Sequence, residues 1–432
     1  MSKIAFVQKN KIPPSPAPIS EVGFIGWVKQ NLFSSWFNTL LTLISIYFIF
    51  IILRDFIPWA WGGHWNTKSL RECLDLNPDV ACFSVLTARW KQLLFGLYPA
   101  EEYWRPTVTF IFLILSMIPI LFPKYFKFFW FSVIYPGLAI WLLWGGSIWG
   151  VGIVYIGLSL GIFTFILLLK LVSKNTVLAG IGSLIFLIIF FMFFSNYIVN
   201  FLNIILPIAL PPVESLKMGG FTLSLIVGIT GIVASFPIGI LLALGRQSNL
   251  PIIKMICVGF IEFIRGVPLI TLLFVASVLL NYFLPPGTNF DIVLRVIIMV
   301  TFFSAAYMAE VIRGGLAGLP LGQHEASASL GLTYWQSQRL VIMPQALKIS
   351  IPGIVNTFIG LFKDTTLVSI ISLRDPVGLA STIRADQTWN GIYWELYVAI
   401  GLMFFIFCFG MSQYSQYLSL IHISEPTRLR SI

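Results

Sequence analysis

The sequence predicts an all-α polytopic membrane protein with about ten transmembrane helices. Of its 432 residues, 58% are hydrophobic and only 10% are charged, whereas a soluble globular domain carries about 25% charged residues. Apolar runs close to the ~20 residues needed to cross a bilayer recur along the chain. Because these runs are continuous and lack strand-like alternation, they favour helices over a membrane barrel.

Ten apolar spans can be placed on the sequence. They lie near 33–53, 106–123, 128–145, 149–170, 176–198, 219–245, 252–283, 292–312, 350–372 and 393–412. The span at 252–283 is too long for one straight crossing. We therefore expect a kink at Pro268, with the first turns lying along the cytoplasmic interface.

The basic residues predict the orientation of the chain. The net charge is +10, but the basic residues lie mainly between apolar runs, so nucleic acid is not an expected partner. With the N-terminus inside, thirteen Lys and Arg fall in the cytoplasmic segments, which are 1–32, 124–127, 170–175, 246–254 and 313–349. The short external loops hold only Lys217, Arg374 and Arg384. The positive-inside rule thus predicts a multi-pass protein with both termini cytoplasmic.

The sequence divides into four regions. In chain order they are a disordered cytoplasmic tail at 1–32, an accessory transmembrane region at 33–213 with an external loop at 54–105, a second transmembrane region at 214–417 with a cytoplasmic loop at 313–349, and a terminal segment at 418–432. The Pro-rich stretch 206–214 separates the two transmembrane regions. The terminal segment looks like a translated sequencing adapter, and we treat it as an artefact that takes no part in the fold.

Two cysteines lie close together in the external loop. Cys73 and Cys82 share this one polar loop, and neither the spacing nor the neighbouring residues suggest a metal site. If the loop is periplasmic, the compartment permits a disulfide between them. A disulfide and two free thiols both remain open from the sequence.

The cytoplasmic loop contains the most informative stretch. Glu325–Leu330 is rich in alanine and predicts a short helix, with the charge of Glu325 favouring its N-terminal dipole. Gly331 then suits the left-handed position that ends a helix. Thr333 and Gln336 form a potential capping box for a second helix, which Pro344 follows. Such a bent, compact element between two spans is shaped to dock against another protein.

This stretch resembles the EAA loop of ABC-importer permeases. The matching positions are Glu325, Ala326, Gly331 and Pro344, and the sequence departs from the pattern at Ser327, Val341 and Met343. In that family the loop inserts into a groove on the ATPase subunit. The resemblance implies that these four residues couple this chain to an ATPase.

Three further stretches narrow the resemblance to permeases of polar, or general L-, amino acids. Phe260–Leu269, Ala309–Gly315 and Gly360–Leu367 keep the order and spacing of that family across 214–417. The likeness implies a five-helix core of the type I importer kind in a bacterial inner membrane. It also implies as partners two ATPase subunits, a homologous second permease subunit and a periplasmic amino-acid-binding protein. ATP would be bound by the ATPase, so no cofactor is expected in this chain.

Charged residues inside the apolar spans are candidates for a translocation path or gate. They are Glu262, Arg265, Glu310, Lys363 and Asp364. Each costs about 2.5–3.5 kcal/mol on insertion scales and therefore needs a partner. Glu262 with Arg265, and Glu310 with Arg313, have the spacing of local helical ion pairs, so structural pairing and a polar path both remain open. Lys363 and Asp364 are adjacent and point about 100° apart, so each needs a different partner.

Two other classes of membrane protein fit the sequence less well. A secondary amino-acid transporter would need no ATPase, but it predicts inverted repeats and broken helices, and the sequence shows neither. A membrane enzyme would need clustered histidines or carboxylates at one face, and nucleotide, zinc and serine-nucleophile motifs are missing. We therefore expect an importer permease that performs no covalent chemistry, holds no metal and moves amino acids from periplasm to cytoplasm.

Overall fold

The chain is helical almost throughout. The computed structural model describes residues 23–171, 176–279, 282 and 290–424. Within these ranges, nine helices are long and apolar enough to cross a membrane, and a sharply bent helix pair makes a tenth crossing if it is one span. The prediction of an all-α polytopic membrane protein with about ten spans is confirmed. By its contacts the chain forms two compact units, Met1–Ser84 and Val85–Ile432.

The first unit consists of three helices, α1 (Gly23–Asn31), α2 (Trp36–Trp61) and α3 (Leu70–Leu76). None of the side chains of α2 is buried, as expected of a helix whose surroundings are lipid. Two sequence boundaries were wrong here. Gly23–Asn31 is helical and was assigned to the disordered tail, of which residues 1–22 lie outside the described part. Residues 54–61 continue α2 instead of opening the external loop.

A disulfide closes the segment that follows α2. Cys73 on α3 is bonded to Cys82, with 5.9 Å between their Cα atoms. The helix α3 begins at Ser69, whose hydroxyl accepts a hydrogen bond from the Glu72 amide at 3.2 Å. Both cysteines are buried, so the disulfide is the small core of this segment.

The second unit begins with the accessory helices. They are α4 (Ser84–Phe95), η1 (Ala100–Glu102), α5 (Trp104–Leu121), η2 (Pro123–Phe128), α6 (Phe129–Trp144), α7 (Ile148–Leu171), α8 (Thr176–Ile189), η3 (Phe190–Phe194) and α9 (Ser195–Ile205). Strand β1 (Gly146–Ser147) pairs antiparallel with β2 (Ala209–Leu210) in the Pro-rich linker. Arg105, which is fully buried, donates to the Pro211 carbonyl at 2.7 Å and pairs with Glu102 at 2.8 Å. The linker is therefore held against the accessory helices.

The remaining helices form the core. They are η4 (Ser215–Lys217), α10 (Gly220–Arg246), α11 (Pro251–Gly266), α12 (Leu269–Phe274), η5 (Val275–Leu279), α14 (Ile292–Ala317), α15 (Leu321–Ser329), α16 (Tyr334–Ser337), η6 (Gln338–Ile342), α17 (Met343–Asp364), η7 (Thr365–Ile371), α18 (Pro376–Arg384) and α19 (Trp394–Ser424). The loop predicted at 313–349 is shorter than expected, because α14 extends to Ala317 and α17 begins at Met343. The adapter-like segment does not interrupt α19, which continues to Ser424; its origin stays a prediction.

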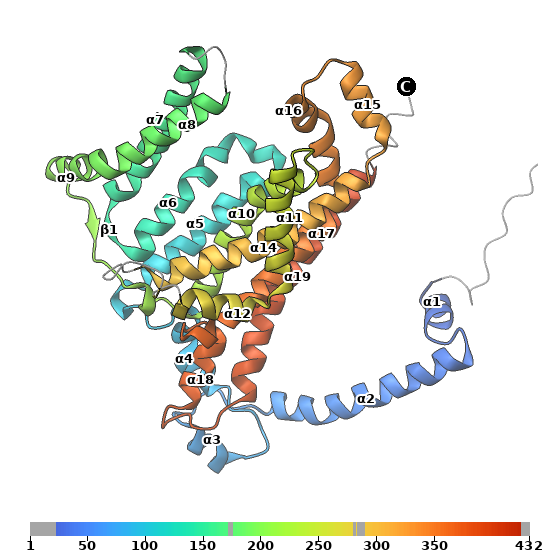
Figure 1. Cartoon of the computed structure of the whole chain (residues 1–432). Helices are drawn as coiled ribbons and strands as arrows, with labels where there is room; N and C mark the ends of the chain where they lie inside the picture. Colours follow the sequence, from blue (N-terminus) through green and yellow to red (C-terminus); the bar gives the residue numbers. More distant parts are fainter. Residues whose placement is uncertain (1–22, 172–175, 280–281, 283–289, 425–432) are drawn as a thin grey trace, which may run out of the picture. The chain divides into compact units, whose positions relative to one another are not determined.

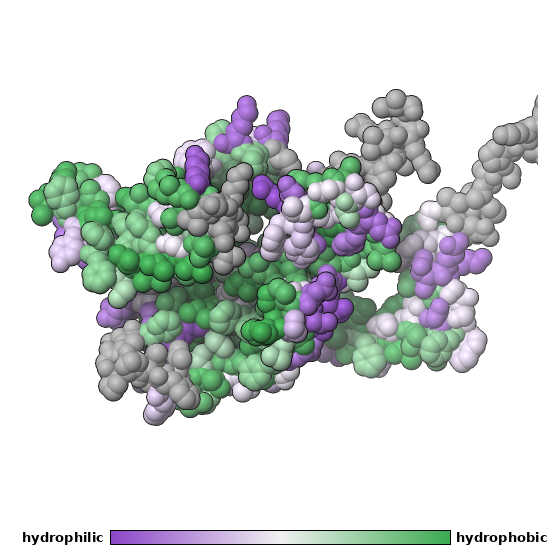
Figure 2. Space-filling model, turned by 45° about the horizontal axis from the view of Figure 1, so that its top comes forward, coloured by the Kyte–Doolittle hydropathy of each residue, from purple (hydrophilic) through white to green (hydrophobic). Residues whose placement is uncertain are grey.

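Helix α10 is the centre of the core. It packs against α14, which in turn packs against α17, and α17 packs against α19 (Figure 1). One apolar cluster joins Leu223, Val227 and Val300 to η7, and a second joins Leu244, Met308 and Ile342. Outside these clusters, apolar side chains cover much of the face seen in Figure 2. This arrangement is typical of a chain whose solvent is lipid.

The helix pair α11 and α12 bends by 101°. The break falls at Val267 and Pro268, where the backbone of Pro268 is extended at φ −59° and ψ 140°. Proline lacks the amide hydrogen needed to continue the helix, and it pushes the preceding residue away from helical geometry. The kink predicted at Pro268 is confirmed.

Three backbone segments cross closely where α10 begins. The Gly220 amide donates to the Arg374 carbonyl at 2.7 Å, and the Thr222 hydroxyl donates to the Leu94 carbonyl at 2.9 Å. Gly96 ends α4 with φ +71°, and a Cβ atom there would overlap the Cα atom of Gly219. The crossing thus holds α4, the start of α10 and the segment before α18 together, and it depends on glycine at positions 96 and 219.

Gly96→Ala should weaken this crossing. The substitution adds left-handed strain of about 1–2 kcal/mol to the overlap with Gly219, so the midpoint of thermal unfolding in detergent should fall and the yield of folded protein should drop. Gly401→Ala is the matched control, because nothing lies within 4 Å of the added methyl on α19. Equal unfolding midpoints for the two variants would show that the close approach is not required.

Asp375 begins α18 from a buried position. Its carboxylate accepts from the amides of Val377 at 3.1 Å and Gly378 at 3.0 Å. Burial nevertheless dominates and raises the pKa of Asp375 to about 6, against these two hydrogen bonds. Its carboxyl therefore binds a proton more tightly in the folded than in the unfolded chain.

The sign of this shift gives a pH dependence. A raised folded-state pKa stabilises the fold below about pH 4, and the contribution is lost as pH rises through about 6. Asp375→Asn keeps the capping oxygen without the charge. The stability of this variant relative to the wild type should therefore rise between pH 4 and pH 7, by on the order of 2 kcal/mol. The difference between their unfolding midpoints, measured across this range, reports the change. Asp375→Ala, which loses the cap, should be less stable than Asp375→Asn at every pH. A constant difference between Asn and wild type across this range would contradict the assignment.

Candidate functional site: the EAA-like hairpin and the arginine–glutamate network

The stretch that resembles the EAA loop folds as a helical hairpin, α15 and α16, which we call the EAA-like hairpin (residues 321–337). The helix α15 ends at Ser329 with Leu330 as its C-cap residue, and Gly331 follows in the left-handed region with φ +70°. The Gly331 amide donates to the Ala328 carbonyl at 2.9 Å and the Leu332 amide to the Ser327 carbonyl at 3.3 Å. This pair of bonds is the Schellman motif. The predicted role of Gly331 at the helix end is confirmed.

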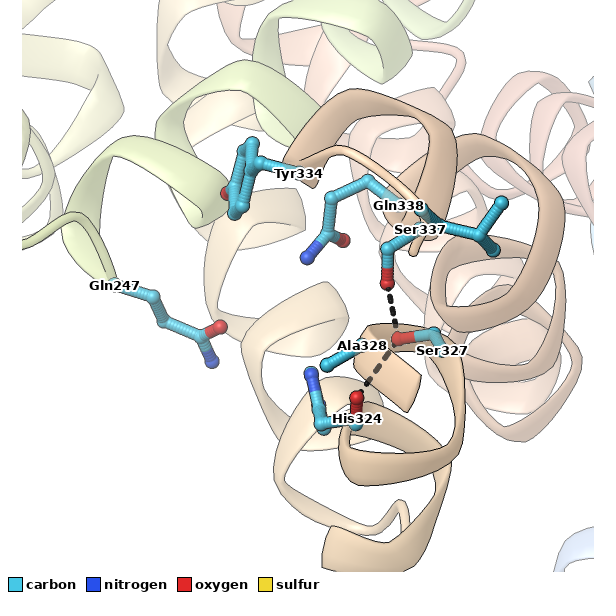
Figure 3. A pocket seen from close by; sticks show the side chains of 8 residues that line it. Gln247, His324, Ser327, Ala328, Tyr334, Ser337 and Gln338 are labelled. Atoms are coloured by element: carbon cyan, nitrogen blue, oxygen red, sulfur yellow. Dashed lines mark hydrogen bonds between the residues drawn. The ribbon is translucent and has the colours of Figure 1, made fainter. Parts of the chain in front are cut away.

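The second arm of the hairpin begins with the predicted capping box. The Gln336 side-chain oxygen accepts from both the Thr333 amide and the Thr333 hydroxyl, each at 2.9 Å. The two arms are also bonded directly, since the hydroxyls of Ser327 and Ser337 lie 2.7 Å apart (Figure 3). Local hydrogen bonds thus fix the angle of the hairpin.

Two expectations about the hairpin were wrong. The first helix begins at Leu321, after Pro320, and not at Glu325. Glu325 therefore lies in the second turn, where the helix dipole is weaker, and its side chain is exposed. The second arm also does not stop before Pro344. It passes through the π-helical turn Gln338–Ile342 directly into α17, and Pro344 is the second residue of α17.

An ion network joins the ends of three core helices. It comprises Arg246 on α10, Glu262 and Arg265 on α11, and Glu310 and Arg313 on α14; we call it the arginine–glutamate network. Glu310 lies at its centre, with only 15% of its side chain exposed. Its oxygens are 2.9 Å from Arg246, 3.0 Å from Arg313 and 3.7 Å from Arg265. One carboxylate is therefore shared by guanidinium groups of three helices.

The second carboxylate of the network lies at its edge. Glu262, with 53% of its side chain exposed, accepts a hydrogen bond from Arg246 at 2.7 Å. Arg265 is held more loosely and lies over the Tyr307 ring, 5.6 Å from its centre. Three arginines against two glutamates leave one positive charge in excess.

The network differs in part from the sequence prediction. The expected ion pair of Glu310 with Arg313 is confirmed. The expected pair of Glu262 with Arg265 is wrong, because Glu262 pairs with Arg246. Arg246 was missed because it was counted only as a positive-inside signal. Its position in the last turn of a long apolar helix was a signal that it would turn back to meet a carboxylate.

Lys363 and Asp364 do not belong to the network. They are the last two residues of α17, at the end of that helix farthest from the EAA-like hairpin. The Lys363 side chain is exposed and that of Asp364 is partly buried. The described residues include no salt bridge to either side chain. As predicted from their adjacency, they do not pair with each other. They remain candidates for a polar surface in the transmembrane region.

The comparisons with known proteins are consistent with this geometry. Residues 235–419 match the family model of binding-protein-dependent transport system inner membrane components. The glutamate/glutamine/aspartate/asparagine transport system permease protein of Rhodobacter capsulatus is 52% identical over 97% of this chain and 98% of its own length. The chain belongs to the amino-acid ABC transporter permease family. An inner membrane amino-acid ABC transporter permease protein of Escherichia coli is 38% identical to the permease over 94% of this chain and 95% of its own length.

A solved structure is also similar to the permease. A crystal structure of an amino acid ABC transporter with histidines has 30% sequence identity, covers 45% of this chain and 89% of its own, and gives a TM-score of 0.41. The family assignment rests on the two relatives that match nearly the whole chain. They establish a multi-pass inner membrane permease of an ATP-driven importer, not a secondary transporter or an enzyme. Membership of this family also implies an ATPase partner.

Removing the central carboxylate tests the network. Glu310→Gln leaves Arg246 and Arg313 without their shared partner. The permease should therefore lose about 2–3 kcal/mol of stability, somewhat less than the loss that follows when one partner of a fully buried ion pair is removed. Glu262→Gln is the control and should cost less than Glu310→Gln, because solvent screens the half-exposed carboxylate of Glu262. Thermal unfolding of the purified permease in detergent measures both. A larger loss for Glu262→Gln would place the centre of the network elsewhere.

Proposed function

We propose that the EAA-like hairpin docks the permease onto its ATPase. Glu325, Ala326 and Gly331 belong to the hairpin, and Pro344 lies where its second arm enters α17. The observation that carries the proposal is the fixed angle of the hairpin, set by the Schellman motif and the capping box. The surface so presented contains both polar and large apolar side chains.

The exposed residues of the hairpin have the chemistry of a protein interface. Leu330 is 76% exposed and Trp335 66% exposed. Leucine and tryptophan on a rigid, protruding element are unfavourable in water unless a partner covers them, and tryptophan is a frequent anchor of interfaces. Exposed Glu325 would meet a basic residue of the ATPase at the rim of this patch.

The remaining subunits complete the importer. Two ATPase subunits would bind ATP, so this chain needs no cofactor of its own. A homologous second permease subunit would present its own hairpin to the second ATPase. A periplasmic amino-acid-binding protein would deliver the substrate. ATP-driven closure of the ATPases would then move the hairpins and switch the permease between its two open states.

The substrates we propose are acidic amino acids and their amides. The relative that is 52% identical over nearly the whole chain is named for glutamate, glutamine, aspartate and asparagine. The positive excess of the arginine–glutamate network suits a carboxylate, and Asp364 with Lys363 offers both signs of charge to a zwitterion. These five charged residues, Glu262, Arg265, Glu310, Lys363 and Asp364, would form the polar path or its gate.

The hairpin is proposed to face the cytoplasm, with both termini on the same side. The distribution of Lys and Arg supports this orientation. The disulfide between Cys73 and Cys82 supports it independently, since disulfides persist in the oxidising periplasm and are rare in the cytosol.

Changes within the hairpin test the coupling. Gly331→Val forces a β-branched residue into the left-handed position at a cost of about 1–2 kcal/mol, and Glu325→Lys reverses the charge at the rim. Both should leave the permease inserted in the membrane. Both should sharply reduce binding-protein-stimulated ATP hydrolysis in proteoliposomes and co-purification with the ATPase.

Two conservative variants serve as controls. Gly331→Asn should retain most activity, because asparagine tolerates the left-handed conformation. Glu325→Gln should fall between wild type and Glu325→Lys. If Gly331→Val and Glu325→Lys both keep wild-type stimulation and transport, the hairpin is only a connecting loop.

A further inference from the structure

A short 3-10 helix carries two lysines between two accessory transmembrane helices. Helix α5 ends at Leu121 and α6 begins at Phe129, and η2 joins them. Lys124 and Lys127 are therefore each within three residues of an apolar span. A 3-10 helix rises ~2.0 Å per residue, so each lysine lies within roughly 6 Å of such a span, which is the thickness of the lipid headgroup layer.

The 3-10 geometry turns both lysines the same way. Residues i and i+3 eclipse each other in such a helix, so Lys124 and Lys127 share one edge of η2, which we call the lysine edge. The rings of Phe126 and Phe129 show the effect directly. Residues at this same spacing stack with their ring centres 5.2 Å apart and their planes at 18°. Both ammonium groups, on flexible four-carbon stems, can therefore reach one phosphate.

Aromatic side chains occupy the remaining edges of η2 and continue into α6. The exposed ones are Tyr125, Phe126, Phe128 and Trp130. Tyrosine and tryptophan are enriched where the hydrocarbon meets the headgroups, and phenylalanine suits the acyl chains below. The turn between α5 and α6 thus has an aromatic part that fits the membrane and a cationic edge at the level of the phosphates.

No carboxylate of the accessory helices balances the lysine edge. Between Glu102 and Glu214 the sequence contains no Asp or Glu. The salt bridges among the described residues include neither Lys124 nor Lys127. The positive-inside rule explains on which side of the membrane the lysines lie. It does not explain why two ammonium groups share one edge, at headgroup depth, without a carboxylate from the described part of the chain.

We propose that η2 binds the headgroup of an anionic phospholipid, with the lipid phosphate between the ammonium groups of Lys124 and Lys127. Hydrogen bonds from an ammonium group to a phosphate are charge-assisted and are stronger than those between neutral groups. A phosphatidylcholine offers the same phosphate together with a cation that opposes the lysines. The bound lipid holds the turn at a fixed depth beside α19, because the Tyr414 hydroxyl donates to the Leu121 carbonyl at 2.8 Å. This site is independent of the proposed coupling role of the hairpin.

The experiment titrates the purified full-length permease in detergent with dioleoyl phosphatidylglycerol or dioleoyl phosphatidylcholine, and it follows the unfolding midpoint. Phosphatidylglycerol should reach half-maximal stabilisation at about thirtyfold lower concentration. That factor corresponds to about 2 kcal/mol at 1.4 kcal/mol per factor of ten, the contribution of two basic residues near an anionic surface. Lys124→Gln combined with Lys127→Gln should lose most of this preference and leave the response to phosphatidylcholine unchanged.

Two control variants separate the lysine edge from net charge. Lys127→Phe combined with Phe128→Lys keeps composition and charge, but it moves one ammonium group a third of a turn away from Lys124. This exchange should raise the concentration of phosphatidylglycerol needed by about fivefold, the loss expected for one lysine. Lys68→Gln combined with Lys217→Gln removes the same charge from exposed positions elsewhere, and it should keep the wild-type preference.

Native mass spectrometry of the same samples counts the bound lipids directly, so the result does not rest on stability alone. At equal lipid concentration, the variant without both lysines should hold less phosphatidylglycerol than the wild type. The proposal is overturned if that variant keeps the wild-type preference, or if phosphatidylcholine binds the wild type equally well. It is also overturned if the exchange of Lys127 and Phe128 has no effect, because net charge alone would then account for the binding. Equal stabilisation by inorganic phosphate would mean that a soluble anion, and not a lipid, occupies the lysine edge.

Discussion

The core of the permease depends on one shared carboxylate. In the hydrocarbon region of a membrane an arginine side chain needs a partner from the protein, because the lipid tails offer none. Glu310 supplies that anion to Arg246 and Arg313 at about hydrogen-bonding distance and to Arg265 slightly further away. The ends of α10, α11 and α14 are consequently tied at one point. Separating any of these helices from the others would break an ion pair between Glu310 and an arginine.

The opposite end of α10 is held by backbone contacts instead of charges. The crossing with Gly96 and the Arg374 carbonyl leaves no room for side chains, and it brings the accessory helix α4 into the core. The bent pair α11 and α12 is joined to α10 by the network and also by apolar packing, since Ile261 shares a cluster with Leu244, and Leu273 shares another with Leu223. Helix α10 is therefore held by charge at one end, by backbone contacts at the other and by apolar side chains between them.

The sequence predicted those features whose physical cause is local. Gly331, the Thr333–Gln336 capping box and the kink at Pro268 follow from conformational preference within a few residues, and each was placed correctly. What failed depended on partners distant in the chain. Glu262 has a suitable arginine three residues away and yet pairs with Arg246, sixteen residues earlier. The Gly96 crossing joins residues more than a hundred positions apart, and no spacing rule describes it.

The continuity of the hairpin with α17 gives the permease a direct mechanical connection. The π-helical turn Gln338–Ile342 joins α16 to α17 without an intervening loop, so a rotation of the hairpin is passed to a helix of about 33 Å length. Lys363 and Asp364 occupy the far end of that helix. Because no loop interrupts this connection, a movement imposed on the hairpin would reach Lys363 and Asp364 through one continuous helical path.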